Sequence, residues 1–258
     1  FTDITTIFEN MYDVEFTYYI IENNSKDDTR EILKDFISKK SKKSKLILFD
    51  VDEDFQNIGE GKNYGRLDGI GNIRNKIVNS ITPLNSEWCI FIDSNIYFKP
   101  NILERMFAYN PSANNIGMMT PYTQQLFIPE IHKSLNLKQP TLMHHFYDTF
   151  AFYDTSNKSS WPFCAFEKCT LCIRKWNDKQ IDRKVVGKYQ EVVDVHSTFG
   201  GFCAINTGII NDKRVRWSTL SYDTKINESI CEHFIFCHNL RLLSDKRIVM
   251  LQNIDDIY

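Results

Sequence analysis

Short apolar runs alternate with amphipathic stretches through the first half of the chain. Runs rich in aromatic and β-branched residues are typical of buried strands, and they occupy residues 16–21, 46–51, 88–92 and 117–120. Apolar residues at helical spacing predict helices over residues 5–12, 27–39, 67–81 and 101–109. Strands that alternate with helices in this way predict an α/β fold with a parallel, doubly wound sheet.

The second half of the chain has a less regular pattern. Its predicted elements are strands over residues 146–153, 196–210 and 247–251 and a helix over residues 230–243. Residues 157–188 are expected to form an irregular insertion. A chain of 258 residues is long enough for one large α/β domain, and we expect a single domain over residues 1–258.

Composition and charge exclude several classes of protein. The chain carries 31 basic and 33 acidic residues, a formal net charge of −2, which argues against nucleic acid as a partner. Hydrophobic residues make up 42% and charged residues 25%, which is the usage of a globular domain rather than of a disordered or fibrous chain. No apolar run approaches the roughly 18 residues of a membrane helix, so we expect no membrane segment.

Six of the seven cysteines fall into two groups. Cys89, Cys203 and Cys237 each stand alone in an apolar string, which favours buried free thiols over a secreted disulfide framework. A second group, close together in the sequence, consists of Cys164, Cys169 and Cys172. This group would need a fourth ligand, such as His196, to bind a structural zinc ion, and a loop without zinc is the alternative.

Polar clusters follow two of the predicted strands, at the ends where open α/β sheets bind ligands. Residues 22–25 (Glu-Asn-Asn-Ser) follow the first run, and residues 93–95 (Asp-Ser-Asn) follow the third. The carboxylate of Asp93 and the amide oxygen of Asn95 are hard ligands that suit Mn²⁺ or Mg²⁺, and such an ion can hold a diphosphate. The alternative for this triplet is an Asx turn or a helix cap at the end of a strand.

Five segments resemble, in the same order, those of A-type (GT-A fold) glycosyltransferases, which use nucleotide sugars as donors. They are the strand and turn at 18–29, Arg66 with Arg74 and Asn75, the strand and triplet at 88–95, the glycine loop at 200–205 and the helix start at 231–237. Residues 147–151 add a similarity to eukaryotic and large-virus enzymes, including fungal capsule-type mannosyltransferases. Together the segments span roughly residues 1–251.

The resemblance implies a single GT-A-like, Rossmann-type mixed sheet flanked by helices, with its first strand upstream of residue 1. It implies a nucleotide-sugar-binding half at 1–125 and an acceptor-binding half at 126–258. The implied activity moves a sugar from a UDP- or GDP-sugar to a hydroxyl of a glycan or glycoprotein, with Mn²⁺ or Mg²⁺. We then expect a cytoplasmic or viral-factory location, and the Golgi lumen stays open if an anchor precedes residue 1.

The resemblance also assigns roles to individual residues. Asp93 with Asn95 would hold the metal, and Glu232 with His233 would form the catalytic pair. The donor-binding residues would be Glu22, Asn24, Arg66, Arg74, Asn75, Asp93 and Ser94. The acceptor-binding residues would be Asp148, Gly200 and Gly201.

Three departures from the family's pattern bear on the chemistry. The metal triplet ends in Asn95 rather than Asp, the acidic pair reads Glu232-His233 rather than Glu-Asp, and the family's C-terminal metal-binding histidine is absent near Tyr258, where one would be expected. The alternative function is therefore a catalytically inactive GT-A-fold module that binds glycans or serves as a scaffold. A nucleotidyltransferase shares the sheet and is a third alternative, which a glycine- and arginine-rich N-terminal loop would distinguish.

Overall fold

The chain divides into two compact units, each with its own sheet. The computed structural model describes residues 10, 16–40, 42–50, 64–94, 96–99, 101–127, 141–146, 150–156, 192–223 and 228–251. The first unit consists of residues 1–84 and 217–230, and the second of residues 85–216 and 231–258. The predicted boundary between a donor half and an acceptor half at residue 125 is a functional division, and it stays a prediction.

The first unit contains a parallel pair of strands. β1 (Tyr19–Asn23) and β2 (Lys45–Phe49) pair in register from Tyr19 with Lys45 to Asn23 with Phe49. Helix α2 (Thr29–Ser38) connects them, so the three elements form one βαβ crossover. The unit also contains α3 (Tyr64–Ile81) and the antiparallel pair β9 (Ser221–Asp223) and β10 (Glu228–Ser229).

Helix α2 begins and packs nearly as its sequence predicts. The N-cap is Asp28, which makes no side-chain capping bond, and the Asp27 carboxylate just before it accepts a hydrogen bond from the Thr29 backbone N–H at 3.0 Å. Phe36 is buried, and its ring meets the ring of Tyr18 edge-on at 5.5 Å between centroids. Ile32 of the same apolar stripe is 63% exposed, so the stripe covers less of the strand pair than its spacing predicts.

The second unit is built on a five-stranded mixed sheet in the order β3-β8-β4-β11-β7. Its strands are β3 (Trp88–Ile92), β8 (Phe202–Asn206), β4 (Ile116–Pro121), β11 (Arg247–Leu251) and β7 (Val192–Asp194). β3, β4 and β11 run in one direction, and β8 and β7 run in the other. The remaining elements are α4 (Ile102–Phe107), α6 (Thr207–Asn211), α7 (Glu232–Ser244) and the antiparallel pair β5 (Gln124–Phe127) and β6 (Thr141–Phe146).

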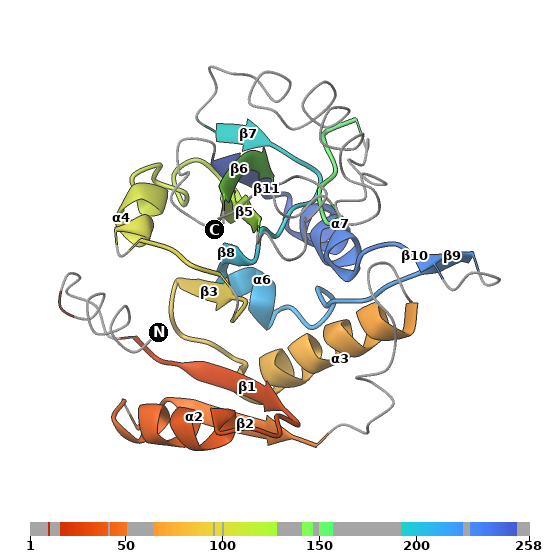
Figure 1. Cartoon of the computed structure of the whole chain (residues 1–258). Coiled ribbons are helices and arrows are strands. Elements are labelled where there is room, and N and C mark those ends of the chain that lie inside the picture. Colours follow the sequence, from red (N-terminus) through yellow and green to blue (C-terminus); the bar gives the residue numbers. More distant parts are fainter. Residues whose placement is uncertain are drawn as a thin grey trace. The chain divides into compact units, whose positions relative to one another are not determined.

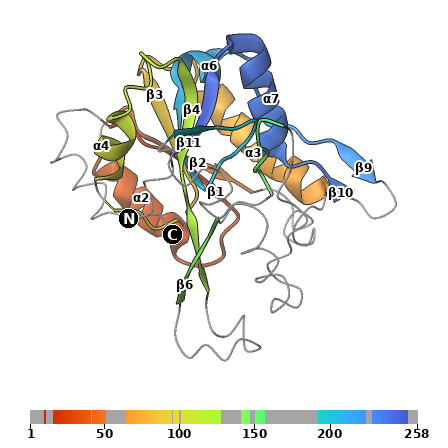
Figure 2. The same cartoon turned by 90° about the horizontal axis from the view of Figure 1, so that it is seen from above.

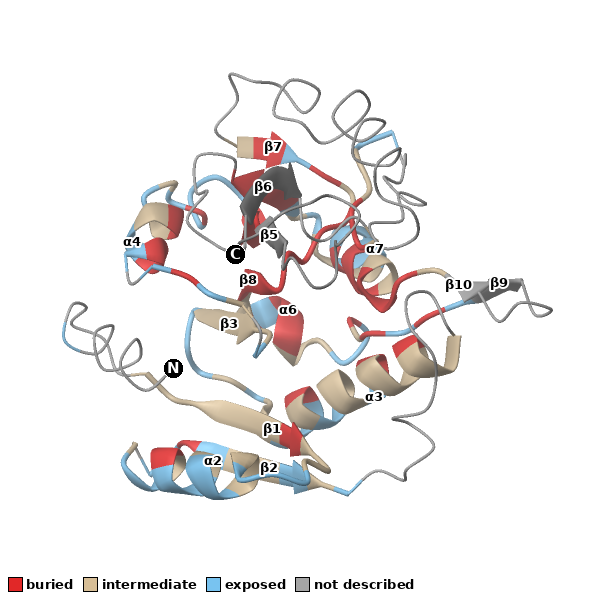
Figure 3. Cartoon of the chain, in the orientation of Figure 1, coloured by how far each residue is buried: buried red, intermediate tan, exposed pale blue. Residues whose placement is uncertain are grey.

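Helices flank this sheet, and its strands form the core of the unit. Figures 1 and 2 show α4 on one side of the strands and α7 on the other. Figure 3 shows buried residues in β8 and on α7, whereas β3 is of intermediate exposure along its whole length. All six residues of β4 are buried, as are the first four of β8, so these strands lie between two covered faces.

The predicted α/β class is confirmed, as is the mixed sheet flanked by helices that the resemblance implies, but the parallel sheet predicted from the alternation of strands and helices is wrong in its pairing. Two strands coincide with the prediction, β3 at Trp88–Ile92 and β11 at Arg247–Leu251. β8 lies antiparallel between β3 and β4, and β1 pairs with β2 in a sheet of its own. The pattern of a strand shows that it is buried, but not which distant strand becomes its neighbour.

Several predicted features are corrected, and others lie outside the described residues. The strand predicted over 146–153 is wrong, because β6 ends at Phe146 and Tyr153 forms only an isolated bridge with Ser197.

Cys203 and Cys237 are buried free thiols, as predicted, whereas Cys89 is partly exposed. Desolvation raises the pKa of the Cys89 thiol to about 12. Outside the described residues lie Asn95, Asp148, Cys164, Cys169, Cys172 and nearly all of the predicted helix at 5–12.

A half-buried arginine, Arg216, binds backbone carbonyls at and after the end of α6. The Nη1 of Arg216 donates hydrogen bonds to the carbonyl oxygens of Ile210 at 3.1 Å, Asp212 at 2.8 Å and Val215 at 2.8 Å. The bonds to Ile210 and Asp212 lie at the C-terminus of α6, where a helix leaves carbonyls without intrahelical partners, and the bond to Val215 ties the following chain to the same guanidinium. Among the helices that the structure describes, none combines the length and the apolar character needed to cross a membrane.

Candidate functional site

Asp93 stands at the end of β3, directly beside the two glycines that precede β8. Ile92 pairs with Phe202, so the residue after one strand lies next to the residue before the other. The Asp93 N–H donates a hydrogen bond to the carbonyl oxygen of Gly201 at 2.8 Å. The structure thus brings the predicted metal ligand against one predicted acceptor-binding glycine.

Both glycines are needed for this close approach. Gly200 has φ +66° and Gly201 has φ +69°, in the left-handed region that side chains rarely adopt. A Cβ on Gly201 would lie 2.5 Å from Cδ1 of Ile96 and 3.7 Å from Oδ2 of Asp93. The hydroxyl of Thr123 donates to the carbonyl oxygen of Gly200 at 2.7 Å and holds the loop from the other side.

Glu232 and His233 open helix α7 and pack against the residue before Gly200. The imidazole of His233 stacks on the ring of Phe199 with 3.8 Å between centroids and 17° between planes. Nε2 of His233 lies 3.4 Å from Oε1 of Glu232, and the Cys231 thiol donates to Oε2 of Glu232 at 3.4 Å. Glu232 is 3% exposed and His233 is 5% exposed. A carboxylate in the first turn is also favoured by the helix dipole.

The segment 199–201 therefore connects two predicted functional groups. Its Phe199 end contacts His233, and its Gly201 end contacts Asp93. Two residue steps span at most about 7 Å between Cα atoms, so both groups border the same short stretch of backbone. Ser94 follows Asp93 and is exposed. Phe199 was not identified from the sequence; an aromatic residue directly before a Gly-Gly pair was the available signal.

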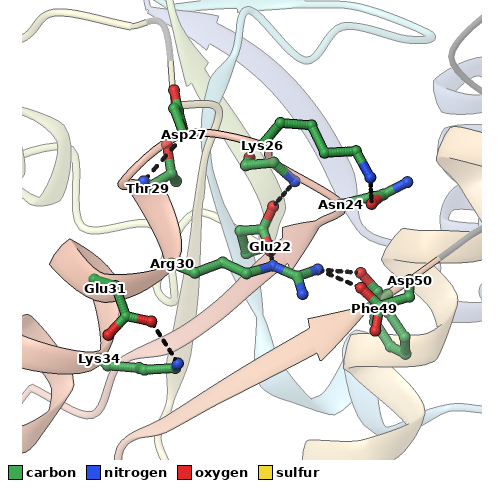
Figure 4. Close-up of polar contacts among 11 residues, drawn as sticks. Glu22, Asn24, Lys26, Asp27, Thr29, Arg30, Glu31, Lys34, Phe49 and Asp50 are labelled. Carbon is green, nitrogen blue, oxygen red and sulfur yellow. Dashed lines mark hydrogen bonds and ion pairs between the residues drawn. The ribbon is translucent and has the colours of Figure 1, made fainter.

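Glu22 lies at the carboxyl end of β1, where its carboxylate is engaged within the first unit (Figure 4). Its Oε1 accepts a hydrogen bond from the Ser25 N–H at 2.6 Å, and its Oε2 accepts one from Nε of Arg30. Burial alone would raise the pKa of Glu22, but the hydrogen bonds from Ser25 and Arg30 and the charge of Arg30 outweigh it and lower the pKa. Glu22 is therefore a charged, buried group that shapes the turn after β1.

Asn24 forms the corner of the same turn. Its backbone is left-handed, with φ 59°, a conformation that asparagine tolerates better than most residues. The Asn24 N–H donates to the carbonyl oxygen of Phe49 at 3.0 Å, and its Oδ1 accepts from Nζ of Lys26 at 2.8 Å. The turn is thereby attached to the end of β2.

Arg66 and Arg74 share one helix, because α3 begins at Tyr64, earlier than the sequence predicts. Eight residues separate them by about 12 Å along the helix axis and about 80° around it. The two side chains therefore leave the helix in clearly different directions. Nζ of Lys76 lies 5.1 Å from the ring centroid of Phe49, which places the second half of α3 at the carboxyl end of β2. Arg74 belongs to that half and Arg66 to the first turn.

Asn75, a predicted donor-binding residue, makes hydrogen bonds that hold the protein backbone together. Its Nδ2 donates to the carbonyl oxygen of Trp217 at 2.7 Å, and its Oδ1 accepts from the Trp217 N–H at 2.9 Å. Trp217 is buried, so one amide satisfies both backbone groups of a residue that lies 142 positions away in the chain. Such a clamp joins α3 to the chain that leads into β9.

Replacing Asn75 with alanine should lower the free energy of unfolding by about 1–3 kcal/mol, because it leaves both backbone groups of Trp217 without this partner. Denaturant unfolding followed by tryptophan fluorescence measures the change. Asn72 is exposed on the same helix and supplies the control, since its alanine variant should stay within about 0.5 kcal/mol of the parent. Unchanged stability of Asn75→Ala with weakened donor binding would instead support a direct role of Asn75 at the donor.

Replacing Glu22 with glutamine should destabilise the protein by about 1–3 kcal/mol at neutral pH, because Arg30 loses a charged partner. Since folding lowers the pKa of Glu22 below its ordinary value of 4.5, the stabilisation is present above that pH and is lost as the pH falls through the folded pKa. Urea unfolding from about pH 7 to about pH 3 should show the two proteins converging at low pH. Glu31→Gln, which alters an exposed pair with Lys34, is the control. A constant difference across this range would contradict the expectation.

The predicted site residues thus form one set in each unit. The first unit holds Glu22, Asn24, Arg66, Arg74 and Asn75, and the second holds Asp93, Ser94, Gly200, Gly201, Glu232 and His233. Within the ranges that the structure describes, no three His, Cys, Asp or Glu side chains lie close enough together to hold a metal ion on their own. The sequence matches no protein-family model, and no curated protein matches it.

Proposed function

We propose that the protein is a glycosyltransferase that moves a sugar from a nucleotide-diphosphate sugar to a hydroxyl of a glycan or glycoprotein. The observation that carries the proposal is the segment 199–201, which borders a carboxylate at the end of β3 on one side and the Glu232–His233 pair on the other. A transferase of this kind needs a group that binds the leaving diphosphate and a base near the attacking hydroxyl. Asp93 and the Glu232–His233 pair, the candidates for these two groups, each border the segment 199–201, which supports the proposal.

Asp93 fits a divalent cation of the kind that binds phosphate. Mg²⁺ and similar ions commonly use one or two carboxylates and take further ligands from substrate phosphates and water. Asp93 is a half-buried carboxylate that follows a strand, and Asn95 is the second predicted ligand. When bound, the ion would supply positive charge that stabilises the departing diphosphate. Gly201 keeps the backbone close to the carboxylate without a side chain between them.

Glu232 is the proposed base. The acceptor oxygen attacks the anomeric carbon, the bond from that carbon to the diphosphate breaks, and the Glu232 carboxylate takes the hydroxyl proton. His233 lies 3.4 Å away and is held by its stack on Phe199, so it can orient the carboxylate or take the proton in its place. If the reaction retains configuration, both residues orient the acceptor instead.

The residues of the first unit enter the proposal through the resemblance alone. Glu22 and Asn24 would contact the base or ribose of the donor, and Arg66 and Arg74 its phosphates. The contacts of Glu22 with Ser25 and Arg30 favour a role in shaping the turn. The clamp between Asn75 and Trp217 likewise favours a structural role for Asn75.

One observation favours the second candidate, a glycan-binding or scaffolding module without transferase activity. Glu232 and His233 are almost fully buried, whereas a base must reach the acceptor hydroxyl. Burial of this degree suits a pair that stabilises the start of α7. The two candidates differ in whether a donor is bound and cleaved.

A panel of UDP- and GDP-sugars with and without Mn²⁺ tests the proposal. We expect one of them to raise the melting temperature and to be hydrolysed slowly in the presence of Mn²⁺. Glu232→Gln should then reduce transfer to an acceptor by roughly 100-fold or more while donor binding persists. Full transfer by Glu232→Gln, with a pH–rate profile that loses its acid limb only in His233→Ala, would move the role to His233. Glycan binding without any donor binding would support the module instead.

A further inference from the structure

Arg30 connects three parts of the first unit that are separate in sequence (Figure 4). It stands in the first turn of α2, and its Nε donates to Oε2 of Glu22 at the end of β1. Its Nη2 donates to the carbonyl oxygen of Phe49 at 2.7 Å and lies 2.8 Å from Oδ1 of Asp50. The guanidinium therefore spans the carboxyl ends of both parallel strands.

The same contacts hold the turn after β1 at both of its ends. The carbonyl oxygen of Phe49 accepts a hydrogen bond from Arg30 and another from the Asn24 N–H. Oε1 of Glu22 holds the Ser25 N–H at 2.6 Å while Oε2 is held by Arg30. Asn24 is left-handed, and such a residue persists when the surrounding structure constrains it. Arg30 is the one side chain among the described residues that donates to both Glu22 and Phe49.

We propose that Arg30 is a positioning residue that sets the geometry of the turn 22–25 for binding the nucleotide of the donor. This inference rests on the proposed function. Ligands of open α/β sheets bind beyond the carboxyl ends of parallel strands, and the turn lies at that end of β1 and β2. Arg30 acts through Glu22 and the end of β2, so it affects how tightly the donor binds and leaves the chemical step unchanged.

Geometry makes lysine an incomplete substitute. A guanidinium carries several N–H groups in a fixed plane and can donate to two partners in different directions. A lysine ammonium carries its three N–H groups on a single nitrogen, so it cannot reproduce the separate Nε contact with Glu22 and Nη2 contact with Phe49. Arg30→Lys should therefore restore only part of what Arg30→Ala loses.

The test compares donor affinity with turnover in Arg30→Ala, Arg30→Lys and Glu22→Gln. Calorimetric titration with UDP and with GDP in the presence of Mn²⁺ measures binding, and steady-state kinetics with the active nucleotide sugar measures KM and kcat. We expect Arg30→Ala to raise Kd and KM about tenfold with kcat unchanged, and Arg30→Lys to fall between it and the parent. Lys34→Ala removes an exposed positive charge from the same helix and should bind like the parent.

A double-mutant cycle separates positioning from direct contact and from a folding defect. If Arg30 acts through Glu22, adding Arg30→Ala to Glu22→Gln should raise Kd much less than it does in the parent. Full additivity of the two changes would overturn the inference, as would a normal KM or a loss confined to kcat in Arg30→Ala. Failure of the parent protein to bind UDP, GDP or any nucleotide sugar would overturn the proposed function together with this inference. An insoluble Arg30→Ala leaves Arg30→Lys and Glu22→Gln to decide by the same criteria.

Discussion

Replacing Asp93 with asparagine should abolish Mn²⁺-dependent binding of the donor. The change keeps the size of the side chain and its ability to accept hydrogen bonds, and it removes the charge that a divalent cation needs. Changes to the residues that merely support a metal ligand weaken metal affinity about 10–100-fold, so loss of the ligand charge should weaken it by roughly 100-fold or more. Titration of Mn²⁺ in the presence of UDP or GDP measures the effect. Asp93→Ala should give the same loss, and Asn95→Ala a smaller one.

The control for Asp93→Asn removes a charge from the same sheet, at the opposite end of its strands. Asp245 is exposed and precedes β11, whereas Asp93 follows β3, which runs in the same direction as β11. Asp245→Asn should leave metal and donor affinity unchanged, because asparagine tolerates the left-handed backbone at this position. Equal Mn²⁺ affinity in Asp93→Asn and Asp245→Asn would show that the ion is held elsewhere.

The fold could be predicted from sequence wherever a local pattern decided the structure. Trp88–Ile92 and Arg247–Leu251 have short apolar strand patterns, and both are strands with these limits. The pairing could not be predicted in this way. β8 enters between β3 and β4 from more than 80 positions further along the chain, and its apolar residues fit any covered position in a sheet. Which strand it joins is decided by the packing of the whole unit.

The residues of the candidate site likewise divide into those that could be predicted from the sequence and those that could not. Asp93 was identified because a carboxylate directly follows an apolar strand, whereas Gly200 and Gly201 were identified through the resemblance to the family's glycine loop. The stack of Phe199 on His233 and the clamp of Asn75 on Trp217 depend on contacts between distant positions, which no spacing reveals. Arg30 was missed for a different reason. Arg30 follows Glu22 by eight residues, and that spacing alone does not show that the two side chains touch. The contact arises because the turn brings the start of α2 back to the end of β1.

Replacing Gly201 with alanine should destabilise the second unit and disrupt the site together. The left-handed backbone disfavours alanine by about 1–2 kcal/mol, and forcing a methyl group into a packed region adds about 1–3 kcal/mol. The sum predicts a fall in melting temperature of roughly 5–15 °C for a chain of this size. Donor binding should fall as well, because the Asp93 N–H is bonded to the Gly201 carbonyl. Gly208→Ala is the control: the position is exposed and has an ordinary φ, and a Cβ there would meet only the side-chain oxygen of Asn206 at 3.0 Å, so it should melt closer to the parent than Gly201→Ala.

A second substitution separates the two causes of this destabilisation. The new methyl group would lie 2.5 Å from Cδ1 and 2.6 Å from Cγ1 of Ile96, and both atoms are absent in Ile96→Ala. The double variant should therefore recover the part of the loss that comes from crowding, while the part that comes from the left-handed backbone remains. Recovery of stability without recovery of donor binding would mean that the bond between Asp93 and Gly201 depends on the backbone conformation itself. A Gly201→Ala variant that melts and binds donor like the parent would show that this loop does not hold Asp93 in place.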